Sequence, residues 1–446
     1  MSDMLSIGAS GVRAYQTALS TVSDNIANVA TPGYAKRTST LSEIEPATGL
    51  HSGGVAATGQ GAVVSGLTRS ADVLRDADVR TAGSDLARSE TSVAWLGRIE
   101  TALTGNQLGD RLTGFFNASK TVAADPTATT PRSAMLEQAS AVAGAFRATG
   151  QALDLLDTNL DATASAAVTT LNALGSTLAK VNEGIARTKG GSAAAASLAD
   201  QRDSILEQMS AISNVSVSID DYGRATVKLG DAGGPTFVSG PQSDSLQVAR
   251  GTDGMIAFTL QRSQSTVSPS GGALAGVVEA GQRISDTRIN LNTIATAFAN
   301  DVNAVQTGGE DLDSKAGTAL FEIGTSPTDI TVKLTDPRGI AAADAGKGPR
   351  DNGNLGKLDA LRTSGAFEGK TTALVSSNAS ALAARKQVAL AQGAMRDNAV
   401  SARDAVSGIN LDSEAVDLLR FQQAYQASSR VIQVAKDTLQ SILDIR

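Results

Sequence analysis

The chain has 446 residues, a net charge of −7 from 45 acidic and 38 basic side chains, no cysteine and a single histidine. Its length predicts two or more domains, and its acidic balance argues against nucleic acid as the main partner, because phosphate contacts need concentrated positive charge. The missing cysteines exclude disulfides, thiolate nucleophiles and thiolate metal sites. With so little imidazole chemistry available, the composition disfavours an enzyme.

Membrane and targeting signals are also missing from the sequence. No apolar run approaches the ~20 residues that span a bilayer, so we expect no membrane insertion. The first positive side chain is Arg13, which is unlike the basic leader of a Sec-type signal peptide. We therefore expect that any export uses another route.

The first thirty residues show the clearest helical periodicity. Apolar or small side chains recur at alternating steps of three and four, the heptad spacing of a narrow seam between paired helices. The seam comprises Leu5, Gly8, Val12, Tyr15, Leu19, Val22, Ile26 and Val29. The segment Thr31-Pro32-Gly33-Tyr34 ends the pattern, since proline disfavours helix at the preceding residue, and we predict that the helix ends near Val29.

Apolar periodicity predicts further helices over the next part of the chain. They are expected over 72–103, 112–116, 130–189 and 198–209. Thr130-Pro131 is typical of a capping residue followed by proline at the first helical position. Gly190-Gly191 interrupts the helical pattern.

The period then drops to two, which predicts strands. Val215, Val217 and Ile219 alternate with serines, and the turn residues Asp220–Gly223 separate them from Thr226–Leu229, so we predict a hairpin. Strand signals continue to about Ser270 and return at 321–323 and 330–334. We interpret them as one discontinuous β domain.

Helical periodicity resumes at Gly271, and after a loop over 336–354 the rest of the chain is predicted to be helical, with breaks at Gly365–Gly369 and Ser407-Gly408. A second heptad seam occupies the last thirty residues. It comprises Leu418, Phe421, Tyr425, Ser428, Ile432, Ala435, Leu439 and Ile442.

These elements predict a mainly α chain with an inserted small β domain (α+β). Long N- and C-terminal heptad helices are expected to pair as an α-helical coiled-coil core beside a helical bundle domain. The predicted units are an N-terminal core helix (1–34), a helical domain (35–212), a β-rich outer domain (213–270 and 318–336), helices returning to the helical domain (271–317), a loop and helical segment (337–407) and a C-terminal core helix (408–446).

Two glycine-rich segments resemble ligand-binding loops only superficially. Gly365–Thr371 has three residues between its glycines, whereas a phosphate-binding loop needs four. Gly59-Gln60-Gly61 lacks the strand–turn–helix frame of a dinucleotide fingerprint. We interpret both segments as ordinary loops and assign no cofactor.

Catalytic and metal-binding patterns are equally weak. His51 adjoins Ser52, but neighbouring side chains diverge, and we interpret His51 as a surface residue. Glu310, Asp311 and Asp313 lack the ligand spacing of a calcium loop. We assign no catalytic residue and no metal.

Both ends carry motifs of one known family. The segment with Asn25, Asn28 and Thr31-Pro32-Gly33-Tyr34 resembles the N-terminal signature of flagellar axial proteins, which are the rod, hook and hook-associated proteins. The segment with Asn410 and Gln422-Gln423-Ala424-Tyr425-Gln426 is similar to their C-terminal signature. Interior segments resemble the hook-associated members that join hook to filament: Asp110–Phe116, Ala124-Asp125-Pro126, Arg132 and Asp200-Gln201-Arg202-Asp203.

The resemblance implies a structural subunit without catalysis, located outside the cell at the hook–filament junction and exported through the flagellar type III apparatus. The implied partners are neighbouring copies, the hook protein, the other junction protein and a cytosolic export chaperone. Another axial protein, such as the hook subunit or the other junction protein, remains the alternative. A flagellum-associated cell-wall hydrolase with paired carboxylates is a distant third.

The predicted interface follows from the two seams. We expect one set of side chains to pack against the other and neighbouring subunits to cover the remaining faces. The sets are Leu5, Val12, Tyr15, Leu19, Val22 and Ile26 on one helix, and Leu418, Phe421, Tyr425, Ile432, Leu439 and Ile442 on the other. Asn25 and Asn28 lie one turn apart, where their amides are expected to bond the last helix carbonyls or the chain turning at Pro32.

Overall fold

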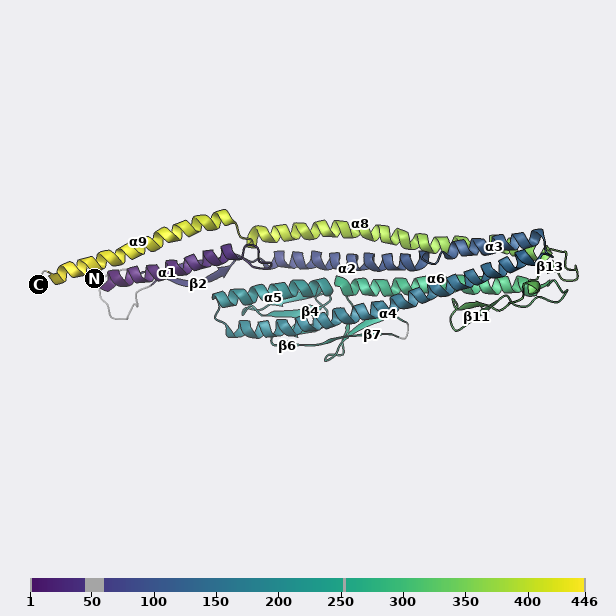
Figure 1. The fold of residues 1–446 in the computed structure, drawn as a ribbon. Helices are drawn as coiled ribbons and strands as arrows, with labels where there is room; N and C mark the ends of the chain where they lie inside the picture. The colour runs from purple at the N-terminus through teal and green to yellow at the C-terminus, as the bar shows by residue number, and fades with distance from the viewer. Residues whose placement is uncertain (1, 45–59, 252–253, 445–446) are drawn as a thin grey trace.

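The computed structural model describes residues 2–44, 60–251 and 254–444, so His51, Ser52 and Gly59 lie outside the described residues. The molecule is elongated, with its helices running along the long axis (Figure 1). The helices are α1 (Ser2–Ala27), α2 (Val73–Thr104), α3 (Leu108–Ala124), α4 (Thr129–Arg187), α5 (Ala193–Ile212), α6 (Gly272–Thr307), α7 (Gly353–Gly365), α8 (Phe367–Ser407) and α9 (Leu411–Asp444). None of these described helices is both long and apolar enough to cross a membrane.

The helices form two parts. At one end α1 and α9 pair with each other, and α2 and α8 continue in the same direction (Figure 1). The helices α4, α5 and α6 pack along α2, and α3 and α7 close the far end. The predicted mainly α architecture with paired terminal helices is confirmed.

A hairpin lies where the sequence predicted only helical domain. Strand β1 (Arg37–Glu43) pairs antiparallel with β2 (Ala62–Arg69), with a register shift between Thr40 and Leu41. The expectation that 35–212 is purely helical is therefore wrong. The strands pack mainly on α1, with a smaller contact to α5. Strand β1 alternates serine and threonine with few apolar residues and lacks the pattern of a half-buried strand.

The other strands form four small antiparallel groups. Strands β3 (Val215–Ile219), β4 (Ala225–Leu229), β5 (Thr236–Ser239) and β6 (Gln242–Ser243) make one sheet, and β7 (Leu246–Arg250), β8 (Ile256–Leu260) and β9 (Thr266–Val267) a second. Strand β10 (Gly309–Glu310) pairs with β13 (Ala343–Asp344), and β11 (Phe321–Ile323) with β12 (Ile330–Val332). A 3₁₀ turn, η1 (Pro337–Gly339), lies between β12 and β13.

The predicted hairpin is confirmed, with Val215 opposite Leu229 and Ile219 opposite Ala225. The expected single discontinuous β domain is wrong, because β11 and β12 pair only with each other and pack on α6 and α4. Periodicity identifies a strand, but it carries no information about which sheet the strand joins.

Three local boundaries also differ from expectation. Helix α1 ends at Ala27, two residues earlier than predicted. Helix α4 begins at Thr129 after the cap position Ala128, so Pro131 lies within the first turn, where a missing N–H leaves no bond unmade. The break after Gly365 is a corner between α7 and α8, made by Ala366 in the left-handed region (φ 48°).

The body of the molecule is organised around Phe298 of α6. Its ring centroid lies 5.6 Å from that of Phe115, 5.3 Å from Phe321 and 5.5 Å from Phe367. These fully buried rings join α3, β11 and α8 to α6. Aromatic pairs at such distances stabilise a core beyond their buried area.

Buried polar side chains attach the loops and sheets to the helices. Arg132 is fully buried and donates to the carbonyls of Pro126 and Ile340, both at 2.7 Å. Asn182 on α4 bonds both the N–H and the C=O of Ala225 at 2.8 Å. Both side chains provide hydrogen-bond partners for backbone groups that water cannot reach.

We predict that Phe298→Ala lowers the free energy of unfolding by about 3–5 kcal/mol, because the lost ring leaves a cavity between α6 and the three elements that pack on it, α3, β11 and α8. Denaturant unfolding followed by fluorescence of Trp95, the single tryptophan, measures it. Ile289→Ala on the same helix is the control: this side chain is 60% exposed, so the change is expected within about 0.5 kcal/mol. Equal effects of the two substitutions would contradict the central role of Phe298.

Candidate functional site

The terminal helices contact each other along the predicted apolar seam. Ala18, Val22 and Phe421 form its buried centre, and Tyr15, Leu19, Ile26 and Leu418 pack against them. The rings of Tyr15 and Phe421 lie 6.4 Å apart. Ala14 and Ala18 are also buried but are absent from the predicted N-terminal seam, which contains only large side chains and Gly8.

The two helices lie close together near the N-terminus of α1. A Cβ atom on Gly8 would lie 2.6 Å from Cγ1 of Ile432, and one on Gly11 would lie 2.7 Å from Oγ of Ser428. Both distances are shorter than real contacts of a Cβ atom, so a larger residue at either position would have to displace the side chain of Ile432 or Ser428. The heptad pattern had placed Gly8, Ser428 and Ile432 on the seams.

The register of the pair leaves two predicted residues without an α1 partner. Because Gly8 lies opposite Ile432 and the helices are antiparallel, Leu439 and Ile442 lie beyond the first described turn of α1. They are 42% and 54% exposed. The prediction that they pack against α1 within one chain is wrong. Leu5, Val12, Tyr425 and Ile432 are half-buried at the seam.

A buried amide connects α1 and α9 at the end of the pair that adjoins the body. Asn25 is 1% exposed; its Nδ2 donates to the carbonyl of Arg37 (2.8 Å) and to Oε2 of Glu414 (2.9 Å). Its Oδ1 accepts from the backbone N–H of Arg37 (3.0 Å) and the hydroxyl of Tyr34 (3.1 Å). Burial raises the pKa of Tyr34, so this hydroxyl keeps its proton.

Glu414 in the first turn of α9 accepts the hydrogen bond from the Asn25 amide. It is 1% exposed and also pairs with Nζ of Lys36 at 2.8 Å. Glu414 lies in the segment of the C-terminal motif, between Asn410 and Gln422, and is not among the predicted site residues. An acid in the first turn of an otherwise apolar seam is the signal that could have found it, since a buried carboxylate needs a partner.

The other motif residues shape the turns. Asn28 Nδ2 donates to the carbonyl of Asp24 (2.8 Å), so it takes up one of the last carbonyls of α1. Gly33 has φ 78°, a conformation that favours glycine between Pro32 and Tyr34. Asn410 Oδ1 accepts from the N–H of Asp412 (2.9 Å) and begins α9. The remaining motif side chains of α9 are not buried: Gln422, Gln423, Ala424 and Gln426.

A second set of apolar side chains lies on α9, away from α1. Val416, Leu419, Val431 and Val434 are 66%, 57%, 38% and 56% exposed. Their spacing places Val416, Leu419 and Val434 on the face opposite Phe421, with Val431 beside that face. Helix α9 therefore carries apolar residues on two faces, and α1 covers one of them.

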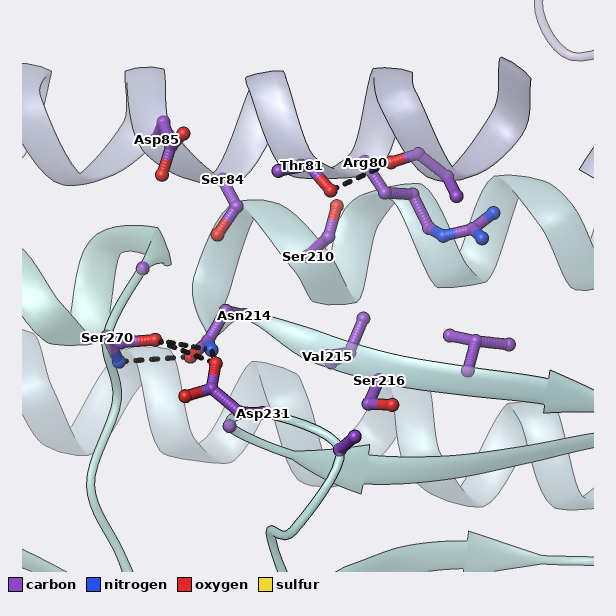
Figure 2. Close-up of a pocket in the computed structure, with 15 residues that line it drawn as sticks. Arg80, Thr81, Ser84, Asp85, Ser210, Asn214, Val215, Ser216, Asp231 and Ser270 are labelled. Atoms are coloured by element: carbon purple, nitrogen blue, oxygen red, sulfur yellow. Dashed lines mark hydrogen bonds between the residues drawn. The ribbon is translucent and has the colours of Figure 1, made fainter. Parts of the chain in front are cut away.

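A polar hollow of about 470 Å³ lies between α2, α5 and β3 (Figure 2). Asn214 bonds Ser270 (2.6 Å) and Asp231 (3.3 Å) there, so these contacts hold the end of α5 against the start of α6. Hydroxyls of Thr81, Ser84 and Ser210 line the opposite wall (Figure 2). Across the described part of the chain, no group of three or more His, Cys, Asp or Glu residues is arranged to hold a metal ion.

Comparison with known proteins points to the flagellum. Residues 5–34 match the flagella basal body rod protein family, and residues 402–445 match the C-terminal family of the rod proteins FlgEFG. Residues 96–321, half of the chain, match the helical domain of flagellar hook-associated protein FlgK. Paired terminal helices on a helical body with these matches define the class of flagellar axial proteins.

Full-length relatives agree with this class. Flagellar hook-associated protein 1 of Salmonella typhimurium is 25% identical, with both chains fully covered over 559 aligned positions. The Bacillus subtilis protein of the same name is 22% identical, covering 97% of this chain and 96% of its own. The solved structure of the hook junction protein FlgK from Burkholderia pseudomallei has the same fold: TM-score 0.65, 16% identity, 74% of this chain and all of that one.

The chain belongs to the family of the flagellar hook-associated protein FlgK. The family expected from the terminal and interior motifs is confirmed, and its members are structural proteins of the flagellum. The alignment with the Salmonella protein spans more positions than the 446 residues of this chain, so that relative carries segments that this chain lacks.

We predict that Asn25→Ala destabilises the terminal pair by about 2–3 kcal/mol, because it removes the partner of the Arg37 backbone groups and of Oε2 of the buried Glu414. Hydrogen exchange measures it: amides in 18–25 and 414–425 are expected to exchange roughly 30–150 times faster. Asn28→Ala is the control, since its amide bonds only its own turn. Equal acceleration in both variants would refute the central role of Asn25.

Proposed function

We propose that this chain is a structural subunit of the hook–filament junction, in which the paired helices α1 and α9 form the inner core and the body carries the outer surface. The observation that supports this most directly is the double apolar surface of α9. One face packs on α1, and the other holds Val416, Leu419, Val431 and Val434 exposed. A helix with apolar residues on two faces is typical of a packed assembly.

The energetics favour association through the outer face. Burying an aliphatic side chain of this size contributes about 1.5–3 kcal/mol, so four of them exceed the cost of fixing a few side chains at an interface. Leu439 and Ile442 extend the apolar surface beyond α1. We infer that neighbouring copies cover these residues, in line with the expectation that neighbouring subunits cover the faces of the terminal helices outside the seam.

The finer assignments rest on the family. Relatives are named hook-associated, and the Burkholderia protein is named a hook junction protein. We infer that this chain contacts neighbouring copies, the hook protein and the other junction protein, and that a cytosolic chaperone delivers it for type III export to the outside of the cell. We infer no catalysis, since the family is structural and the candidate interface is made of packed helices.

Deletion of the gene in its own host tests the function. We expect cells with hooks but without filaments by electron microscopy, and filament subunits in the medium. Normal filaments would contradict the proposal, and loss of the hook itself would indicate an earlier axial component.

A double substitution, Val416→Ser with Val434→Ser, tests the outer face. We expect the deletion strain carrying this variant to lose most of its filaments, because the association free energy falls by roughly 3 kcal/mol or more per subunit contact. The helix content, measured by circular dichroism, is expected to stay unchanged. Gln433→Ser with Gln440→Ser on the same helix, at exposed polar positions, is the matched control and is expected to restore filaments. Filaments restored equally by both variants would contradict the role of this face.

A further inference from the structure

We propose that Asp200 and Asp203 of α5 are positioning residues that fix the angle between the α1–α9 pair and the body, defined as residues 73–407. The proposal rests on the proposed function in one respect: the pair is taken to be the part that assembles. The residues belong to the interior motif Asp200-Gln201-Arg202-Asp203, to which the function proposed above gives no role.

The polypeptide connections alone do not hold this angle. The chain enters the body from β2 through residues 70–72 and leaves it for α9 through residues 408–410. Two backbone bonds also cross this joint, from Lys36 N–H to the Ser407 carbonyl at 2.9 Å and from Leu67 N–H to the Gly191 carbonyl at 2.7 Å. Beside them a cavity of about 970 Å³ separates the turn at 29–35 from α2, α5 and α8. Because this space is open to solvent, apolar packing does not hold the joint here, and polar contacts have to brace it.

The hairpin β1–β2 supplies the brace. It lies along α1, where Thr21 Oγ1 bonds Ser39 Oγ (2.8 Å) and Ser10 Oγ accepts from the N–H of Ala62 (3.2 Å). The hairpin therefore moves with the pair. At its base Arg37 and Arg69 stand opposite each other in the strand register.

The guanidinium groups of both arginines bind carboxylates on α5 of the body. Asp200 accepts from Arg37 Nη2 at 2.7 Å and from Arg69 Nε at 2.6 Å, and Asp203 pairs with Arg69 Nη1 at 2.7 Å. These four side chains are only 11–15% exposed. Burial opposes the charge of Arg69, but Asp203 and Asp200 outweigh it and raise the pKa of the guanidinium. Buried, hydrogen-bonded ion pairs of this kind are short and directional.

The contacts continue into both parts. On the body side Arg202 pairs with Asp203 (2.7 Å) and donates from Nη1 to the carbonyl of Gly223 (2.6 Å) in the turn between β3 and β4. On the other side the backbone of Arg37 holds the Asn25 amide, which binds Glu414 of α9. A continuous polar path thus runs from a sheet of the body to the first turn of α9. Any rotation of the pair against the body has to break the Arg–Asp contacts in this path.

Distance measurements on the full-length chain test the proposal. The sequence has no cysteine, so spin labels can be placed at Gln426→Cys and Lys180→Cys, both exposed and on opposite sides of the joint. A second pair, Ala94→Cys and Lys180→Cys, lies within the body. We expect one narrow distance distribution across the joint, and in the double variant Asp200→Asn with Asp203→Asn a distribution roughly twofold broader.

Three controls separate positioning from general destabilisation. In the double variant the distance within the body and the emission of the buried Trp95 are expected to stay unchanged. Asp200→Glu keeps a carboxylate and is expected to retain the narrow distribution. Glu183→Gln removes one carboxylate charge from an exposed ion pair within α4 and is expected to leave the distance distribution unchanged.

The proposal is overturned if the double variant keeps the native distribution across the joint, or if the unmodified chain is already as broad as the double variant. It also fails if Asp200→Glu broadens the distribution as much as the double variant. Failure of the proposed function would be recognised separately. Filaments would then form normally in cells with the outer-face variant Val416→Ser with Val434→Ser, and this result does not depend on the label distances.

Discussion

A carboxylate removed from water determines how the two ends of this chain come together. Glu414 is satisfied only when the Asn25 amide and the Lys36 ammonium are in place, and both belong to the opposite terminus. A buried charge without partners costs several kcal/mol, so neither terminal segment reaches a stable arrangement without the other. The apolar seam supplies attraction along the length of the helices, and the Asn25–Glu414 contact fixes their register.

The body and the joint, which comprises residues 70–72, residues 408–410 and the base of the hairpin, are held by different kinds of interaction. In the body, aromatic rings around Phe298 bring together helices and a strand that are far apart in sequence. At the joint, charged and amide side chains connect elements whose backbone groups have no regular partner, and a cavity remains beside them. Apolar packing tolerates small shifts of side chains, whereas short ion pairs depend steeply on direction. Orientation in this molecule therefore depends on a few polar contacts rather than on buried area.

Much of the fold could be predicted because its information is local. Heptad spacing identified the seams of α1 and α9, and alternation with serines identified the hairpin of β3 and β4. The hairpin of β1 and β2 was not predicted because β1 consists largely of serine and threonine and β2 has two adjacent valines, so neither strand shows regular apolar alternation. The partners of Asp200 escaped for another reason: Arg37 is 163 residues away, and no spacing rule connects them. Heptad spacing also shows which face of a helix is apolar but not where its partner ends, which is why Leu439 and Ile442 were paired wrongly.

The length of α4 gives the joint a mechanical meaning. This helix has 59 residues and corresponds to about 90 Å at 1.5 Å per residue. Its C-terminal end lies near the base of the hairpin, where Leu67 bonds Gly191, and it runs to the far end of the body (Figure 1). The body is thus a lever arm pivoted at the hairpin base. A rotation of roughly one degree there displaces the far end by about 1.5 Å, half the length of a hydrogen bond, so the positional precision of the outer surface is limited by the stiffness of a few ion pairs.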